Sequence, residues 1–308
     1  MAFASCPSAP TGVRARSWRS SLPKLNYRGE QVDIGGRSLR VVRAGPKDSV
    51  HPLVVCEHGA FGCASDWAVV QDKLSARGLR SLAYDRAGLG HSDAGPAPRD
   101  GRAINDDLEA LLGSLGETGP ILLAGHSMGG LMVRLYALER EWPIVGLVLV
   151  DAVTPDVFSL PGGPAAIKGF GRLLQLASAG ARVGMMVPVS FISGNLIGLT
   201  GEAGREKRRI HASAPHAHGA AAEVMAWPDT SRMAGAIELP VTMPVAVVTA
   251  GPHQARGPIK QIQETPAKLS QYGYIEHVTA ATHANLLGPR YADAVVRGVD
   301  HVLQAGSR

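Results

Sequence analysis

Cysteine is scarce in this sequence: there are three, Cys6, Cys56 and Cys63, in 308 residues. Three cysteines do not make a disulfide framework, so we expect a reducing, cytoplasmic setting. No segment repeats with a period of about 20–50 residues, which excludes solenoids and propellers. Neither a phosphate-binding P-loop nor a dinucleotide fingerprint occurs, and we expect no cofactor.

Acidic residues are missing from the start of the chain. Five basic residues precede Glu30, the first acidic one, and they account for the net charge of +5. The remaining chain holds 26 basic and 26 acidic residues. Its charge is therefore balanced, and we expect no nucleic-acid partner. Residues 1–27 also lack the apolar run of a secretory signal. We interpret them as a basic, flexible tail, with a transit peptide as the alternative.

A long apolar run is missing as well. The strongest candidate, residues 183–200, has no charged residue, but it contains Pro188 and Asn195 and directly follows Arg182. Its length only approaches that of a membrane-spanning helix. We therefore expect a buried or lid-like segment here and no integral membrane segment.

Short apolar runs alternate with helical patterns along most of the chain, which is typical of a parallel α/β sheet covered on both faces. The alternation stops for about 85 residues, an interruption that predicts an inserted domain rather than one loop. We expect a core of residues 28–154 and 236–308, and a mainly helical cap of residues 155–235. The expected strands are 38–45, 52–59, 79–88 with its exit loop, 120–125, 144–151, 244–251 and 273–280, and the expected helices are 64–78, 104–116, 130–140, 260–272 and 291–304.

One serine stands at the turn between an expected strand and an expected helix. Gly125-His126-Ser127-Met128-Gly129 fits the pattern G-x-S-x-G in the strand–turn–helix context that this motif requires. The flanking glycines leave room for a tight turn that exposes a nucleophilic hydroxyl. The same turn brings the Met128 N–H to a helix N-terminus, where it would stabilise an oxyanion.

Three motifs occur in order: HGAFG at 58–62, DRAGLGHS at 85–92 and GHSMGG at 125–130. On these motifs the chain resembles the α/β-hydrolases with a cap domain, over roughly residues 28–304. The resemblance implies the α/β-hydrolase fold, with a mostly parallel central sheet flanked by helices. It says nothing specific about the substrate.

The resemblance also implies further catalytic groups. It places the base that activates the serine in the loop after the last strand, where His283 stands; His277 is the rival, but it lies inside the strand pattern. It assigns the second oxyanion N–H to Ala60, with Phe61 as the alternative donor.

The acid of the triad departs from the commonest pattern of these hydrolases. The stretch after the strand that follows the cap, PVAVVTAGPHQARG, has no carboxylate, and His253 falls where an aspartate is usual. Asp151 ends the preceding strand, a position that resembles the arrangement in some lipases, one branch of haloalkane dehalogenases and the zearalenone-type lactone hydrolases. We expect Asp151 to orient the histidine. Asp156 and Glu276 are the alternatives.

The expected cap contains charged and apolar groups whose roles stay open. Its basic cluster is interpreted as a solvated helix face, with recognition of an acidic substrate as the alternative. Its histidines have no cysteine or acidic partner at ligand spacing, so we expect a surface loop and no metal site. The basic cluster is Arg205, Lys207, Arg208 and Arg209, and the histidines are His211, His216 and His218. The cap also has apolar side chains that would line a substrate pocket together with Phe61. Alternatively, they form the cap's own core. They are Phe158, Phe170, Met185, Met186, Phe191 and Ile192.

These residues predict a serine hydrolase that cleaves a small-molecule carboxylic ester or lactone, of apolar character, through an acyl-enzyme. Serine at position 127 argues against a dehalogenase or an epoxide hydrolase, because those reactions need a carboxylate nucleophile. A cofactor-free lyase, a carbon–carbon hydrolase or a perhydrolase on the same triad is the alternative, as is a non-catalytic binding scaffold. The oligomeric state is left open.

Overall fold

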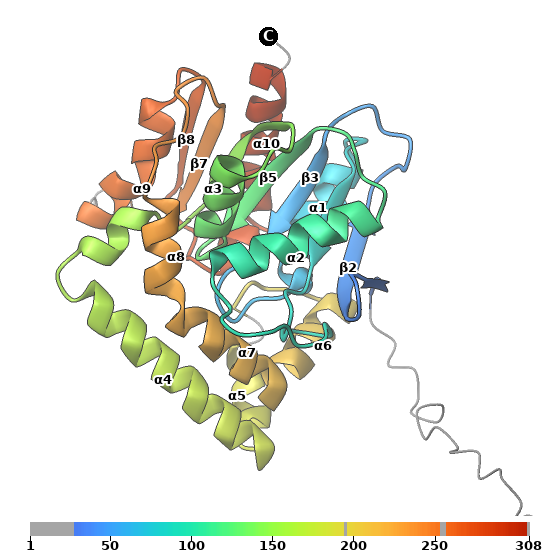
Figure 1. The fold of residues 1–308 in the computed structure, drawn as a ribbon, viewed down its shortest axis with the longest axis vertical. Coiled ribbons are helices and arrows are strands. Elements are labelled where there is room, and N and C mark those ends of the chain that lie inside the picture. The colour runs from blue at the N-terminus through green and yellow to red at the C-terminus, as the bar shows by residue number, and fades with distance from the viewer. Residues whose placement is uncertain (1–27, 194–195, 253–256, 307–308) are drawn as a thin grey trace, which may run out of the picture.

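The centre of the fold is an eight-stranded sheet with the strand order β1-β2-β4-β3-β5-β6-β7-β8 (Figure 1). The computed structural model describes residues 28–193, 196–252 and 257–306. Strands β4, β3, β5, β6, β7 and β8 run parallel, while β2 pairs antiparallel with β4 and with β1. The strands are β1 (Glu30–Asp33), β2 (Ser38–Ala44), β3 (Leu53–Glu57), β4 (Ser81–Tyr84), β5 (Ile121–His126), β6 (Ile144–Val150), β7 (Val245–Ala250) and β8 (Gly273–Val278).

Helices cover both faces of the sheet because successive strand residues point to opposite sides. In β5, Leu122 and Ala124 pack with helices α1 and α10, whereas Ile121 and Leu123 pack with α2, α3 and α9. The predicted parallel α/β sheet is thereby confirmed. The helices of the two faces are η2 (Ala64–Trp67), α1 (Ala68–Ser75), α2 (Gly101–Ser114), α3 (Gly129–Glu139), α9 (Pro258–Leu269), η4 (Asn285–Leu287) and α10 (Ala292–Gly306).

Element boundaries differ from the predicted ones where a cap residue decides them. Helix α2 begins three residues before the first predicted residue, because the Asp100 side chain accepts a hydrogen bond from the Ala103 N–H and caps the helix. Strand β1 was not predicted; its four residues are largely exposed and carry no apolar run. The predicted tail, residues 1–27, lies outside the described residues.

Between β6 and β7 the chain folds into helices, which we call the helical insertion (residues 155–235). Figure 1 shows α4 to α7 gathered at one end of the sheet, at the bottom of the view. Helix α4 packs along α7. The division into core and cap remains a prediction from the sequence pattern. The insertion comprises η3 (Pro155–Ser159), α4 (Gly163–Arg182), α5 (Met186–Ser193), α6 (Gly201–His211), α7 (Ala214–Met225) and α8 (Trp227–Ala234).

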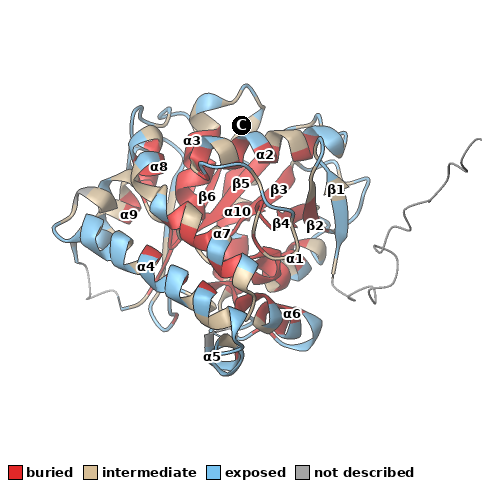
Figure 2. Ribbon diagram, turned by 60° about the horizontal axis from the view of Figure 1, so that its bottom comes forward, coloured by how far each residue is buried: buried red, intermediate tan, exposed pale blue. Residues whose placement is uncertain are grey.

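Parts of the insertion differ from expectation. The run 183–200 is not generally buried: Val183, Phe191 and Ile192 are 73%, 65% and 76% exposed, and Figure 2 shows α5 as largely exposed. Conversely, Lys207, His211 and His216 are buried on α6 and α7, so the predicted solvated face and surface loop are wrong for these three residues. The pattern of charge did not reveal which face of each helix meets the core. Within the described chain, no helix combines the length and apolarity needed to cross a membrane.

Candidate active site

Ser127 lies in a tight turn at the carboxyl end of β5. Its φ of 55° lies in the left-handed region, which is strained for a residue with a side chain and costs roughly 1–3 kcal/mol. Two hydrogen bonds to the next strand and its exit hold the turn: the Ser127 N–H donates to the Val150 carbonyl at 3.1 Å, and the Val153 N–H donates to the Ser127 carbonyl at 2.8 Å.

Small residues allow that turn to form. A Cβ on Gly125 would lie 2.7 Å from the carbonyl oxygen of Gly129, and a Cβ on Gly129 would lie 2.5 Å from the carbonyl oxygen of Glu57. Gly59, in the loop after β3, approaches from the other side; its Cβ would lie 2.9 Å from that of Ser127. The serine is therefore held at the sheet edge by backbone contacts that leave no space for larger neighbours.

His283 and Asp151 lie together beside this turn. Nδ1 of His283 is 2.7 Å from Oδ2 of Asp151, so the Nδ1–H of the histidine donates a hydrogen bond to the carboxylate. Asp151 is 7% exposed and, like Ser127, has a positive φ, 41°. Burial opposes ionisation, but the hydrogen bonds from His283 and Lys260 outweigh it and hold the pKa of the Asp151 carboxyl well below its usual value. The carboxylate is charged and suited to orient the imidazole.

The second oxygen of Asp151 has partners that the sequence did not reveal. Nζ of Lys260 lies 2.8 Å from Oδ1, and the backbone N–H of Ala250 donates to the same oxygen at 3.3 Å. Nε2 of Gln263, one helical turn beyond Lys260 on α9, lies 3.5 Å from the same Oδ1 of Asp151. The i, i+3 spacing of Lys260 and Gln263, on the helix that follows the strand beside Asp151, is the signal that would have found them.

His126, directly before the serine, supports the loop of His283. Its Nε2 lies 3.0 Å from the His283 carbonyl oxygen, and the two rings are 4.7 Å apart. Burial lowers the pKa of His126 to about 3, so the ring is neutral and can donate the hydrogen of Nε2 to that carbonyl. This contact links the backbone of His283 to the residue before the serine.

A cavity of about 210 Å³ is lined by His126, Ser127 and His283, whereas Asp151 is not in its lining. Its volume is below the range of about 300–1,000 Å³ that is common for drug-sized ligands. Ala60 and Phe61 line it, whereas Met128 does not, and no acceptor for the backbone N–H groups of these three residues occurs among the described residues. The lining residues are Gly59, Ala60, Phe61, Asp66, His126, Ser127, Phe170, Leu196, Ile197, Lys207, His211, His283 and Ala284.

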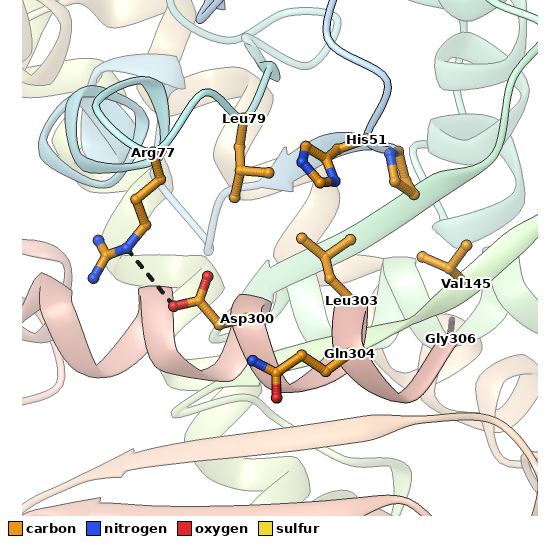
Figure 3. A pocket seen from close by; sticks show the side chains of 9 residues that line it. His51, Arg77, Leu79, Val145, Asp300, Leu303, Gln304 and Gly306 are labelled. Atoms are coloured by element: carbon orange, nitrogen blue, oxygen red, sulfur yellow. Dashed lines mark ion pairs between the residues drawn. The ribbon is translucent and has the colours of Figure 1, made fainter. Parts of the chain in front are cut away.

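Two larger cavities lie elsewhere and do not contain the serine. One of about 320 Å³ is at the amino ends of the strands, between the chain before β3 and the end of α10 (Figure 3). Arg77 and Asp300 pair across it at 3.7 Å. The other, of about 390 Å³, lies beside β2. Ligands of open α/β sheets bind at the carboxyl ends of the strands. The cavity of about 210 Å³ beside Ser127 is therefore the better candidate for a substrate site.

The predicted substrate wall is only partly assembled around the cavity. Phe61 and Phe170 line it, whereas the other apolar side chains of that prediction are not among its described lining. Met185 and Phe191 are mostly exposed, at 67% and 65%. The residues outside the lining are Phe158, Met185, Met186, Phe191 and Ile192.

Two buried histidines hold Phe61. Its ring lies 4.4 Å from that of His211 and 4.6 Å from that of His216. Nδ1 of His216 accepts from the Gly90 N–H at 3.1 Å, and its Nε2 faces the Phe61 carbonyl at 3.4 Å. Phe61 has a φ of 55°, so these contacts stabilise a strained residue at the cavity wall.

The alternatives for acid and base lie in other contacts. Asp156 is exposed in η3, and Glu276 pairs with Arg297 of α10. His277 is in β8, with Nδ1 2.6 Å from the Thr249 hydroxyl. His253 lies outside the described residues. No group of three or more His, Cys, Asp or Glu that could hold a metal occurs in the part of the chain that the structure describes.

Known proteins resemble this chain in sequence and in fold. Residues 52–172 match the sequence model described as the alpha/beta hydrolase fold. The sn-1-specific diacylglycerol lipase ABHD11 of Mus musculus is 35% identical over 116 residues, which are 37% of this chain and 36% of that protein. The chain spans less than half the length of the curated relatives it matches, between 22% and 47%.

Two solved structures superpose over most of the chain. A thermophilic esterase from Thermogutta terrifontis has a TM-score of 0.66 and 20% identity, covering 89% of this chain and 98% of that one. The enol-lactonase from Burkholderia xenovorans LB400 has a TM-score of 0.63 and 20% identity, covering 89% and 100%. At this identity the likeness concerns the fold. The chain therefore has the α/β-hydrolase fold, with the sequence signature of that family in residues 52–172.

Proposed function

We propose that this protein is a serine hydrolase that cleaves a small carboxylic ester or lactone through an acyl-enzyme. The observation that carries the proposal is the shared cavity of Ser127 and His283, with Asp151 bonded to the far side of the histidine. These are the three groups that serine hydrolysis requires, in the chain order of nucleophile, acid and histidine.

In the proposed reaction, His283 takes the proton of the Ser127 hydroxyl as the oxygen attacks the substrate carbonyl. The N–H of Met128 and that of Ala60 or Phe61 stabilise the oxyanion, and each such donor contributes roughly 10²–10³ in rate. His283 then protonates the leaving alkoxide. A water molecule, deprotonated by the same histidine, hydrolyses the acyl-enzyme and releases the acid. The helical insertion covers the site as its cap.

Other features support parts of this proposal. The compact cavity, with Phe61, Phe170, Leu196 and Ile197 in its wall, favours a small and largely apolar substrate. The free thiols Cys56 and Cys63 agree with a reducing, cytoplasmic setting. A lyase, a carbon–carbon hydrolase or a perhydrolase would use the same groups, and analysis of the products separates these reactions from ester hydrolysis.

The test is the intact mass after incubation with a fluorophosphonate probe, for the wild type and for Ser127→Ala. We expect one adduct on the wild type and none on the variant, followed by hydrolysis of short p-nitrophenyl esters by the wild type alone. A folded wild type that takes no adduct would contradict the proposal and favour a binding scaffold. Circular dichroism of both proteins is the control for folding.

A further inference from the structure

The cavity beside Ser127 has a polar wall that the proposed hydrolysis does not use. Asp66 of η2 and Lys207 of α6 both line it and form an ion pair. Their side chains are 6% and 5% exposed. One comes from the core of the fold and the other from the helical insertion, so the pair joins the two parts at the cavity.

The Lys207 ammonium group has more N–H donors than it has acceptors among the described residues. An ammonium group has three donors, and among the described residues only Asp66 accepts from this one. The Asp66 carboxylate has a second donor besides Lys207, because its Oδ2 also accepts a hydrogen bond from the Cys63 N–H at 3.3 Å. Buried donors without acceptors are costly. An oxygen of a bound substrate would satisfy those of Lys207.

The charges around the pair favour a neutral oxygen over a carboxylate. Lys207 and Asp66 balance each other, and His211, which lines the same wall, is neutral because burial lowers its pKa. A substrate carboxylate at Lys207 would also come close to the carboxylate of Asp66. Repulsion between like charges in a buried site opposes that arrangement.

We propose that Lys207 determines specificity by donating a hydrogen bond to a carbonyl or hydroxyl oxygen that is remote from the scissile carbonyl of the substrate. The inference rests on the proposed function and narrows its substrate class to compact oxo- or hydroxy-substituted esters and lactones. Apart from this ion pair, Ser127 and three histidines, the lining of the cavity is apolar or glycine, and the Lys207 ammonium is a donor that the proposed hydrolysis does not use.

The test uses pairs of neutral esters that differ by one carbonyl oxygen. p-Nitrophenyl levulinate and p-nitrophenyl valerate place the difference in the acyl part, and acetoin acetate and sec-butyl acetate place it in the alcohol part. The quantity measured is the ratio of kcat/KM within each pair. In the wild type we expect the oxo ester of at least one pair to be preferred by roughly 10–100-fold, since a site built to bond an oxygen rejects the analogue that lacks it.

The variant combines Asp66→Asn with Lys207→Met, because Lys207→Met alone would leave a buried carboxylate unpaired. The asparagine oxygen can still accept from the Cys63 N–H. We expect the preference to vanish, with the loss mainly in kcat/KM of the oxo ester. Lys207→Gln, which keeps an amide donor toward Asp66, is the second variant and should weaken the preference. Arg205→Met, an exposed cation on the same helix, is the matched control and should keep it.

The outcomes separate this inference from the proposed function. A wild type that reacts with the fluorophosphonate probe but prefers no oxo ester would overturn the role of Lys207 alone. An equal fall of kcat for both members of each pair would show a structural role for the ion pair and would also overturn it. Absence of the adduct on the wild type would contradict the proposed hydrolysis itself.

Discussion

Nδ1 of His283 lies 2.7 Å from Oδ2 of Asp151, although the two residues are 132 positions apart. The other oxygen of Asp151 accepts from Lys260 and from the Ala250 N–H, so the carboxylate is anchored on both sides. The side chain of His283 is 53% exposed, and its hydrogen bond to the anchored carboxylate fixes its orientation. Four sets of variants test this arrangement and the contacts elsewhere in the fold.

The first concerns the acid. Asp151→Asn should lower kcat by roughly 10³–10⁴, because an amide does not stabilise the imidazolium or select its tautomer as a carboxylate does. Hydrolysis of p-nitrophenyl butyrate measures the change. Asp156→Asn is the control and should keep the wild-type rate, since Asp156 is exposed in η3. A large loss in Asp156→Asn with normal activity in Asp151→Asn would reverse the assignment.

The second concerns pH. Burial, with a smaller effect of Lys207, lowers the pKa of His216 to about 3, whereas an unfolded histidine has a pKa of about 6.5. Between these values the unfolded chain binds a proton that the folded protein does not. The free energy of unfolding therefore rises with pH in this window, by up to about 1.4 kcal/mol per pH unit from this residue.

Urea titrations of His216→Asn between about pH 4 and 6 test this slope. The asparagine oxygen can accept the Gly90 hydrogen bond, and we expect the variant to lose stability less steeply than the wild type as the pH falls. His218→Asn, at an exposed position of the same helix, should keep the wild-type slope. The same slope in His216→Asn as in the wild type would mean that His216 is already protonated in the folded protein.

The third concerns the attachment of the insertion. Arg86 makes two hydrogen bonds to Glu223 of α7, at 2.7 and 2.8 Å, and also pairs with Glu57 of β3; all three side chains are fully buried. Glu223→Leu should lower the free energy of unfolding by about 3–5 kcal/mol, because it removes one partner of a buried ion pair.

Glu139→Leu is the matched comparison for this change. It removes the partner of Arg102, whose side chain is 59% exposed, and should lower the free energy of unfolding far less, because solvent screens an exposed ion pair. Urea unfolding followed by circular dichroism measures both. Equal effects of the two substitutions would show that the buried cluster does not stabilise the fold more than a surface pair.

The fourth concerns the glycines of the turn. Gly129→Ala should slow fluorophosphonate labelling of Ser127 by roughly 10²-fold, because its Cβ would collide with the Glu57 carbonyl and displace the serine. Gly113→Ala is the opposite case: its Cβ meets nothing within 4 Å on the exposed side of α2. That variant should gain about 0.5–1 kcal/mol of stability and label normally. Normal labelling of Gly129→Ala would contradict the role given to the tight turn.

The order of strands and helices could be predicted because each element has a local signal. The apolar runs of β3, β5, β6 and β7 are buried on both faces and read continuously in the sequence. The turn at Ser127 could be located because the G-x-S-x-G pattern is local and Gly125 contacts Gly129 within it, whereas the close approach of Gly129 to Glu57 appears only in the tertiary structure. Strand β1 was missed because it is exposed and has no such pattern.

Contacts between the insertion and the core could not be predicted in this way. Lys207 lies in a basic segment with Arg205, Arg208 and Arg209, and only the packing of α6 against η2 separates it from those residues and buries it beside Asp66. Lys260 and His126 likewise acquire roles around Asp151 and His283 only because their elements meet at one sheet edge.

By itself, the sequence determined the fold class, the position of the serine turn and the candidates for its partners, because hydrophobic periodicity and turn chemistry are local properties of the chain. The tertiary structure decided which carboxylate meets His283, which cation enters the cavity and which apolar side chains remain outside. Those choices depend on distances between residues more than a hundred positions apart, and they are set by packing and by the pairing of buried charges.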